Sequence, residues 1–411
     1  MIYNEPIGVI ELGSIKIKCI IFKINNDNSS EILSTSLNDS EGIHNGVVIN
    51  LSKASNVIRS CISSAEKKAE VSLKRINVII EQPEFLCTKL SKNRKINGSK
   101  IHKDDITFLL KEAKKQVILN DDTQSIIHIF NHNYIVDGKM FSEEPIDVYA
   151  NYLSHEMTFI TMPKNNIKNI NQVFINCDIE VERFISCTFA LAIQLLNNNE
   201  LQFGTILIDM GFEKTSLGIF KNLALINSTT LPIGINHIIK DVSKVCLLNL
   251  DESKNIVKKI DFSFQDNNQV FDNKELLINT YFNHTNFRKI SKTLLLNVIQ
   301  DRLNEIFETL KKQIILSGFD PKFGNNLYIT GGGSRLMNLS KYCSKIFNSD
   351  VKKIESTQNV KESSLQENNF VACFGALKLI KDGWETEAIP ELKSSGDDKS
   401  NFFSKIFRNL T

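Results

Sequence analysis

One short pattern occurs twice, far apart in the chain, and it constrains the fold more than any other feature. Residues 205–220 form an apolar, β-branched run, a turn at Asp209–Gly211 and a second apolar run, which together predict a hairpin of two strands. Residues 7–22 repeat this order around Glu11–Gly13. Each copy carries an acidic residue at the strand end and a glycine two positions later. The repeat predicts a duplicated architecture with two related lobes.

A third segment complements the two hairpins. Leu327–Thr330 is typical of a strand, and Gly331-Gly332-Gly333 follows it directly. Glycine lets main-chain N–H groups approach a phosphate, and carboxylates organise Mg²⁺ and water. Any one strand–Asp–x–Gly pattern also occurs at ordinary β-turns. The order of the three segments is what indicates an actin-like fold, in which a nucleotide is held between two lobes.

The length of the chain requires more than one hydrophobic core. It has 411 residues, of which 42% are hydrophobic, so we expect two lobes. The 49 Lys and Arg nearly balance the 47 Asp and Glu, which argues against a nucleic-acid partner. The 8 cysteines form no Cys-x-x-Cys pair, which favours free thiols in a reducing compartment. We expect no signal peptide, and no apolar run is long enough to span a bilayer.

Periodicity and turn signals give a coarse secondary structure. Helices are predicted over residues 51–69, 103–116, 188–196, 234–245, 253–259, 291–316 and 370–379. Further strands are predicted at 76–80, 126–130, 134–136, 157–161, 174–177 and 180–184. Residues 81–160 differ in their predicted pattern of one helix and several strands from the segments around them. They are predicted to be a small α+β insert in the first lobe. Residues 385–398 are acidic and contain Pro, Ser and Gly, which predicts a flexible linker.

These elements resemble the FtsA family of actin-like bacterial division proteins over nearly the whole chain. The stretches that carry the resemblance best are 42–50, 126–137, 232–241, 294–302, 327–339 and the C-terminal helix. The insert is the specific part, because the FtsA family has a subdomain called 1C where actin has a different one. Residues 81–160 are similar to 1C in place and pattern.

The resemblance implies a fold and its divisions. It implies an α/β, two-lobed actin-like fold of the actin, heat-shock chaperone and sugar kinase superfamily, with a 1C insert and a C-terminal amphipathic helix. The implied parts are subdomain 1A at 1–80 and 161–200, 1C at 81–160, 2A at 201–235 and 326–384, 2B at 236–325, the linker at 385–398 and the amphipathic helix at 399–411.

The resemblance also implies a site for ATP and Mg²⁺. The expected nucleotide contacts are Glu11, Gly13, Ser14, Lys16, Gly211, Lys214, Thr215, Lys254, Gly331, Gly332 and Gly333. Glu11 and Asp209 are the expected Mg²⁺ ligands. Asp209 is also the candidate catalytic residue, because it could orient a water molecule around the metal.

The chain departs from the family pattern at this site. The second hairpin of the family runs Asp-x-Gly-x-Gly-Thr-Thr-Asp, whereas Phe212, Glu213 and Lys214 occupy its central positions here. A Cβ atom and an added negative charge both disfavour a phosphate, although Lys214 could compensate. Glu11 replaces an aspartate, and Ser253-Lys254 replaces an Ala-Glu pair that helps hold the ribose. We therefore expect weak ATP binding or slow hydrolysis; drift that leaves binding intact is the alternative.

The function implied by the resemblance is that of a scaffold, with at most a weak ATPase activity. Such a protein tethers FtsZ filaments to the cytoplasmic face of the inner membrane at the septum, self-associates, and helps to recruit later divisome proteins through 1C. The FtsZ C-terminal peptide is expected on 2B, with Arg288, Lys289 and Arg302 as candidate contacts. A PilM-like scaffold of type IV pilus assembly and a small-molecule kinase are the alternatives. The altered second hairpin argues against the kinase.

Residues 400–411 have an amphipathic pattern. At about 100° per residue, one arc of the helix holds five large apolar side chains and the opposite face holds two cations. The expected membrane contacts are Phe402, Phe403, Lys405, Ile406, Phe407, Arg408 and Leu410. Such a helix is too short to span a bilayer and suits the surface of an anionic membrane. Docking of the helix on the protein itself is the alternative.

Overall fold

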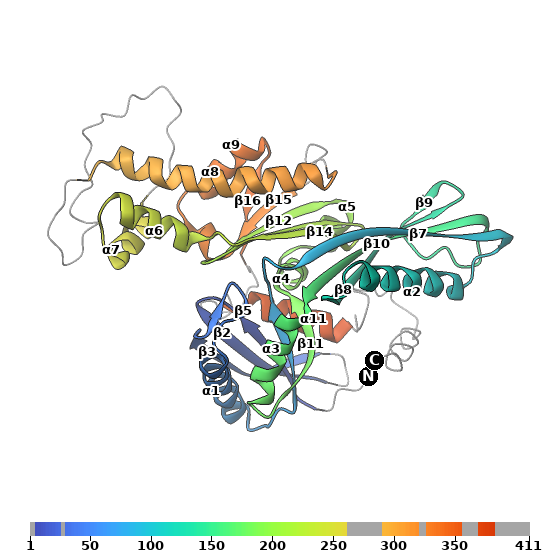
Figure 1. The fold of residues 1–411 in the computed structure, drawn as a ribbon, viewed down its shortest axis with the longest axis horizontal. Coiled ribbons are helices and arrows are strands. Elements are labelled where there is room, and N and C mark those ends of the chain that lie inside the picture. Colours follow the sequence, from blue (N-terminus) through green and yellow to red (C-terminus); the bar gives the residue numbers. More distant parts are fainter. Residues whose placement is uncertain (1–4, 26–28, 261–289, 320–325, 356–368, 383–411) are drawn as a thin grey trace. The chain divides into compact units, whose positions relative to one another are not determined.

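The chain divides into two compact units. The computed structural model describes residues 5–25, 29–260, 290–319, 326–355 and 369–382 (Figure 1). Unit 1 comprises Met1–Gly204, Phe220–Ser228 and Ser356–Thr411, and unit 2 comprises Thr205–Ile219 and Thr229–Glu355.

Unit 1 is built on a five-stranded sheet in the order β11-β6-β1-β2-β3. Its strands are β1 (Ile7–Leu12), β2 (Lys16–Ile24), β3 (Ser30–Asp39), β6 (Arg75–Ile80) and β11 (Glu180–Ser186). β1 and β2 form the predicted antiparallel hairpin, whereas β1, β6 and β11 are parallel. The carboxyl ends of these three parallel strands therefore meet at one edge of the sheet. A short hairpin, β4 (Ile43–His44) and β5 (Val47–Val48), precedes the first helix.

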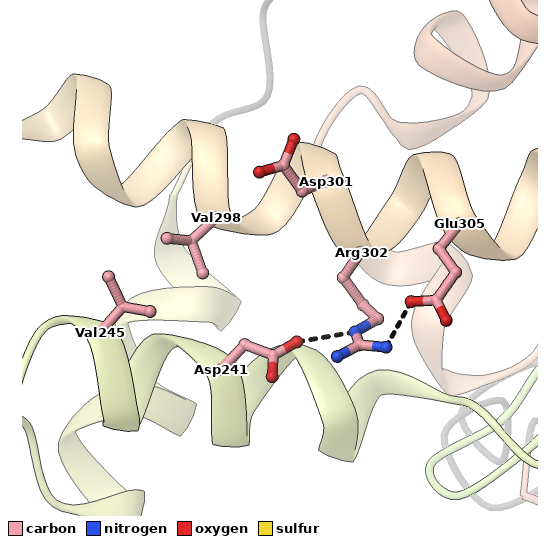
Figure 2. Close-up of a pocket in the computed structure, with 6 residues that line it drawn as sticks. All are labelled: Asp241, Val245, Val298, Asp301, Arg302 and Glu305. Atoms are coloured by element: carbon pink, nitrogen blue, oxygen red, sulfur yellow. Dashed lines mark hydrogen bonds and ion pairs between the residues drawn. The ribbon is translucent and has the colours of Figure 1, made fainter.

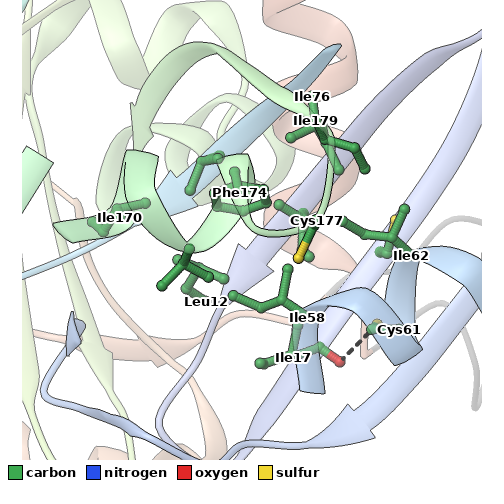
Figure 3. Close-up of a cluster of buried hydrophobic side chains, with 14 of the residues drawn as sticks. Leu12, Ile17, Ile58, Cys61, Ile62, Ile76, Ile170, Phe174, Cys177 and Ile179 are labelled. Atoms are coloured by element: carbon green, nitrogen blue, oxygen red, sulfur yellow. Dashed lines mark hydrogen bonds between the residues drawn. The ribbon is translucent and has the colours of Figure 1, made fainter. Parts of the chain in front are cut away.

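Helices bury the apolar residues of this sheet. They are α1 (Leu51–Ala69), α3 (Lys164–Ile175), α4 (Cys187–Leu195) and α11 (Val371–Asp382). A short helix, α5 (Asn198–Phe203), follows α4. Figure 3 shows Ile58 of α1 and Phe174 of α3 packing with Leu12 and Ile17 of the hairpin. Asn50 begins α1, because its side chain accepts a hydrogen bond from the main-chain N–H of Lys53.

The insert is a four-stranded antiparallel sheet with one helix. Its strands are β7 (Leu86–Lys100), β8 (Gln124–Val136), β9 (Lys139–Phe141) and β10 (Tyr149–Pro163), in the order β7-β10-β8-β9. α2 (Lys103–Asn120) packs on the sheet through Ile106, Leu109, Leu110 and Ala113. The insert thus has cores of its own.

A buried histidine joins the insert to the main sheet of unit 1. The Nε2 atom of His128 in β8 accepts a hydrogen bond from the main-chain N–H of Ser186, at 2.9 Å. Ser186 Oγ and the N–H of Thr188 both donate to Oε2 of the buried Glu81, each at 2.9 Å. Burial, reinforced by the charge of Arg183, lowers the pKa of His128 to about 3. His128 is therefore neutral in the folded protein at ordinary pH.

This histidine makes the stability of unit 1 depend on pH. The pKa of His128 is about 3 in the folded chain, against an ordinary value of 6.5. Between these values the unfolded chain binds the proton and the folded chain does not, so stability falls as the pH falls. We expect a loss of about 2 kcal/mol between pH 6.5 and pH 5. Thermal unfolding measured at several pH values in this range should show the loss of stability. The control is His128→Gln, in which the stability should fall less steeply with pH. Equal pH dependence in the two proteins would contradict the prediction.

The second five-stranded sheet has the order β14-β13-β12-β15-β16. Its strands are β12 (Thr205–Met210), β13 (Thr215–Lys221), β14 (Ala224–Leu231), β15 (Asn326–Thr330) and β16 (Val351–Lys353). β12, β15 and β16 are parallel. The helices in the described part of unit 2 are α6 (Ile235–Val245), α7 (Leu250–Lys259), α8 (Lys292–Leu316) and α9 (Leu339–Phe347), with a 3-10 turn at Gly332–Arg335. As predicted, α8 buries an apolar stripe that includes Leu295, Ile299, Leu303, Ile306 and Phe307.

Some sequence predictions were wrong in detail. Residues 174–177 were predicted to be a strand, but α3 continues to Ile175 because Ile170, Val173 and Phe174 are buried on one helical face. The strands predicted at 126–130 and 134–136 are one continuous strand, β8. α11 also differs from the expected division, since it packs in unit 1 rather than with residues 326–355. Gly375 allows this packing, because a Cβ atom there would lie 1.8 Å from the carbonyl oxygen of Ala190 in α4.

Candidate functional site

The first hairpin places an ion pair at the strand end. Glu11 of β1 lies opposite Lys18 of β2 in the register of the hairpin. Lys18 Nζ donates to both carboxylate oxygens of Glu11, at 2.8 and 3.0 Å. Burial opposes the ammonium charge, but the Glu11 carboxylate outweighs it and raises the pKa of Lys18. Since both oxygens of Glu11 already accept from Lys18, Glu11 fits the predicted Mg²⁺ role poorly.

The two hairpin turns share one geometric constraint. A Cβ atom at Gly13 would lie 2.6 Å from the carbonyl oxygen of Lys16, and one at Gly211 would lie 2.9 Å from that of Lys214. The pattern repeated in the sequence is therefore repeated in the turns, and in both the glycine is needed for close approach of the chain. The side chain of Lys16 pairs with Asp39 of β3, at 2.6 Å. Ser14 is half-buried beside Gly13.

The structure brings Asp209 and the glycine turn together. β12 and β15 are parallel neighbours with Asp209 opposite Thr330, so the segments that follow them meet at one sheet edge. Gly331 has φ +86°, and a Cβ atom there would lie 2.2 Å from Oδ1 of Asp209. Gly332 is exposed, with nothing within 4 Å of its Cβ position. The carboxyl ends of neighbouring parallel strands are where open α/β sheets bind ligands.

The beginning of α6 closes the second hairpin turn. Asn236 donates from its main-chain N–H to the carbonyl of Phe212, at 2.8 Å, and from Nδ2 to Oε1 of Glu213, also at 2.8 Å. Gly234 must be glycine, because a Cβ atom there would lie 2.5 Å from the Phe212 carbonyl oxygen. Glu213 is only 9% exposed, and its Oε2 has no hydrogen-bond partner within the described residues. A buried acidic side chain thus occupies the turn that would approach a phosphate.

The other predicted contacts of this site differ in burial. Thr215 is buried, and its hydroxyl donates to the carbonyl of Ile233 at 2.7 Å. Lys214 is half-buried on the turn, whereas Lys254 is exposed on α7. In the part of the chain that the structure describes, no three His, Cys, Asp or Glu side chains gather as metal ligands. Nucleotide-bound Mg²⁺ commonly uses one or two carboxylates together with phosphate oxygens.

A pocket of about 250 Å³ lies between α6 and α8 in unit 2 (Figure 2). Its lining residues are Asp241, Val245, Val298, Asp301, Arg302 and Glu305. Arg302 Nε donates to Oδ2 of Asp241 at 2.7 Å, and Nη1 of Arg302 donates to Glu305. The hydrogen bond that Arg302 donates to Asp241, against some desolvation, raises the pKa of Arg302. The charge of this candidate partner contact is therefore already paired.

Sequence reasoning missed five polar residues of these sites: Lys18, Asn236, Asp241, Asp301 and Glu305. Hairpin register would have found Lys18, because Glu11 and Lys18 are symmetric about the turn. Asp241 contacts Arg302 from another helix, and no spacing within one segment indicates such a contact. Glu305 lies three residues after Arg302 on α8, a spacing at which helical side chains meet, so this contact could have been found from the sequence. The candidate contacts Arg288 and Lys289, and all seven predicted membrane contacts, lie outside the described residues. Among the described helices, none is long and apolar enough to cross a membrane.

Comparison with solved structures defines the class of the protein. The chain is similar to the PilM–PilN type IV pilus biogenesis complex, with a TM-score of 0.61, 11% identity, and coverage of 90% of this chain and 96% of the other. It is also similar to MreB5 of Spiroplasma citri bound to ADP, with a TM-score of 0.54, 13% identity and coverage of 92% and 98%. The paired strand-and-glycine turns and these likenesses define an actin-like protein, as the sequence predicted.

Sequence comparison narrows the class to one family. The model of the cell division protein FtsA matches residues 206–375, and that of the SHS2 domain inserted in FtsA matches residues 86–161. The cell division protein FtsA of Agrobacterium fabrum is 22% identical over 362 residues, covering 85% of this chain and 81% of that protein. The chain belongs to the FtsA family of cell division proteins, and its insert is the SHS2 domain of that family.

Proposed function

We propose that this protein is a division scaffold that tethers FtsZ filaments to the cytoplasmic face of the inner membrane at the septum. The observation that carries the proposal is the agreement of two family models, one on the insert and one on most of unit 2. Self-association, recruitment of later divisome proteins through the insert and binding of the FtsZ C-terminal peptide at 236–325 belong to the same proposal. The test is a fluorescent fusion expressed at native level, which should gather at midcell only while FtsZ is present. A uniform distribution would contradict it.

ATP is the proposed ligand, with weak binding and slow hydrolysis. The open backbone at Gly332 and the nearby Asp209 carboxylate fit an adenine turn and an Mg²⁺ ligand. The likeness to an ADP-bound protein supports this assignment at the level of the fold. The buried Glu213 disfavours a phosphate at the second turn. The ion pair of Glu11 with Lys18 leaves Glu11 a poor second ligand for the metal. When bound, Mg²⁺ would offset the negative charge of the nucleotide phosphates.

Restoring small residues in the second turn should strengthen ATP binding. We expect Phe212→Gly, Glu213→Gly and Lys214→Thr, made together, to tighten ATP by tenfold or more, because they remove Cβ atoms and a carboxylate. Titration calorimetry with ATP and Mg²⁺ measures the change. The matched control, Glu213→Gln, removes only the charge and should give part of the gain. Tight ATP binding with fast turnover in the unaltered protein would contradict the argument.

Two other functions remain as alternatives. The likeness to the PilM–PilN complex favours a pilus scaffold at the level of the fold alone. A fusion that gathers at pilus sites instead of midcell would support that scaffold. A kinase requires intact phosphate turns and an acceptor-activating carboxylate, so the filled second turn argues against it. Rapid phosphorylation of sugars or acetate by the purified protein would reverse this conclusion.

A further inference from the structure

The chain contains two Asn-Gly dipeptides, Asn45-Gly46 and Asn97-Gly98, which offer the same chemistry in different surroundings. In such a dipeptide the glycine nitrogen can attack the side-chain carbonyl carbon of the asparagine, because no Cβ atom hinders the approach. The new C–N bond closes a five-membered succinimide ring, and ammonia leaves. Water then opens the ring to aspartate or isoaspartate, so water is the only co-reactant.

The first dipeptide is held in place by its neighbours. Asn45 and Gly46 join β4 to β5 and both have positive φ, +50° and +79°. Gly46 is buried, and a Cβ atom there would lie 2.2 Å from the carbonyl oxygen of Glu81. The carbonyl oxygen of Gly46 accepts a hydrogen bond from Nε2 of the buried Gln82, at 2.6 Å. Because succinimide closure requires the main chain to rotate at Asn45, this packing opposes the reaction.

The second dipeptide has a similar backbone conformation in open surroundings. Asn97 and Gly98 have φ +57° and +74°, and both are exposed. With Ile96 they lie opposite the single residue Asn151 of β10, so they form a bulge in the edge strand β7. A Cβ atom at Gly98 would meet only Asn151 Oδ1, at 3.9 Å. The main-chain N–H of Asn151 is engaged by the carboxylate of Asp137, at 3.0 and 3.1 Å. Rotation at Asn97 therefore meets little resistance.

We propose that Asn97 is a site of spontaneous deamidation and that the fold protects Asn45 from the same reaction. The two dipeptides have the same sequence and the same sign of φ at both residues, so the difference comes from packing. The reaction depends on neither FtsZ nor nucleotide.

The product would change both the charge and the pairing of the insert edge. β7 carries five Lys and Arg residues and no acidic residue. The new carboxylate would stand two residues after Lys95 and three before Lys100. Isoaspartate also lengthens the main chain by one carbon atom, so the pairing of Ser99 with Ala150 would have to shift. Older molecules would thus differ from new ones at this strand.

Peptide mapping of the full-length protein by mass spectrometry tests the proposal. The purified protein is kept at neutral pH for several days, and the fraction of aspartate and isoaspartate is followed at both positions. We expect conversion about tenfold faster at Asn97 than at Asn45, because packing around Gly46 opposes ring closure. The rate at Asn97 should rise with pH, since the Gly98 nitrogen must lose its proton before it attacks. Equal rates at the two positions, or a faster rate at Asn45, would overturn the proposal.

The unfolded protein and two variants separate the fold from the sequence. In guanidinium both asparagines should convert at similar rates; a slow Asn45 there would show that the fold does not protect it. Asn97→Gln should retain its amide, because the longer side chain would have to close a larger ring, and should leave conversion at Asn45 unchanged.

The second variant loosens the bulge. Ser99→Ala removes the hydrogen bond from Ser99 Oγ to the carbonyl oxygen of Ile96, at 2.7 Å, which spans Asn97 and Gly98. Conversion at Asn97 should become a few times faster, while Asn45 keeps its rate. A rate at Asn97 far below that of the unfolded protein, and unchanged by Ser99→Ala, would show that the bulge is closed to the reaction and would overturn the proposal.

Discussion

Replacing Gly375 by alanine should lower the stability of unit 1 by about 3 kcal/mol. The new Cβ atom would lie 1.8 Å from the carbonyl oxygen of Ala190 and 2.6 Å from its carbonyl carbon. Both are main-chain atoms inside α4, so they cannot move aside as a flexible side chain would. α11 must shift away from α4, which loosens the buried residues on its inner face, such as Cys373 and Leu379. The better helix propensity of alanine, about 1 kcal/mol, offsets only part of this cost.

Thermal unfolding measures the effect of this substitution. For a unit of this size, a loss of about 3 kcal/mol lowers the melting temperature by roughly 6–12 °C. Lys381→Ala changes a half-buried residue of the same helix and should shift the melting temperature by less than about 2 °C. A melting temperature of Gly375→Ala equal to that of the unaltered protein would show that α11 does not pack closely against α4 in solution.

Removing residues 400–411 should abolish binding to anionic vesicles. The predicted helix buries its apolar arc in the membrane surface, at about 2 kcal/mol per large side chain, and folding of the helix costs part of this gain. Phe407→Glu puts a charge in the middle of that arc and should weaken binding about a hundredfold. Flotation of the full-length protein, of a truncation at Lys399 and of Phe407→Glu measures this. Vesicles should retain the first protein and release the other two.

The control for membrane binding keeps the arc and changes the opposite face. Asn401 is on the polar face of the predicted helix and carries no charge. The Asn401→Gln variant should therefore float with the vesicles as the unaltered protein does. We expect one helix alone to bind weakly and reversibly, and several copies held along an FtsZ filament to bind firmly. Adding FtsZ filaments should therefore increase retention of the full-length protein. Equal retention of all variants would place the membrane contact elsewhere.

Much of the fold followed from the sequence because its signals are local. Continuous apolar runs predicted both hairpins, whose strands are buried on both faces. Periodicity and turn signals predicted α1, α6 and α8, each of which buries one helical face. β7 was missed because lysine, serine and asparagine fill this strand at the edge of the insert sheet. The position of α11 in unit 1 could not be predicted, because it depends on a contact between Gly375 and Ala190 that lie far apart in the chain.

The candidate site was predictable in its outline but not in its charges. Strand ends and glycines singled out Asp209 and Gly331 as separate site residues, and the structure places them side by side. Glu213 was recognised as a departure from the family pattern, but its burial and its bond to Asn236 arise from the fold. Arg302 was interpreted from its positive charge alone. The carboxylates that neutralise it come from another helix and from the next turn of its own.

α6 takes part in both sites of unit 2, and this sharing has a thermodynamic consequence. Its first turn holds the Phe212–Glu213 turn through Asn236, and its next turn supplies Asp241 to the pocket. A ligand that shifts α6 at one site therefore changes the contacts of α6 at the other site. By linkage, if nucleotide changes the affinity for the peptide by some factor, the peptide changes the affinity for nucleotide by the same factor. Binding of the FtsZ peptide would then change the fraction of protein that holds nucleotide, and nucleotide would change the fraction that holds the peptide, even if ATP is never hydrolysed.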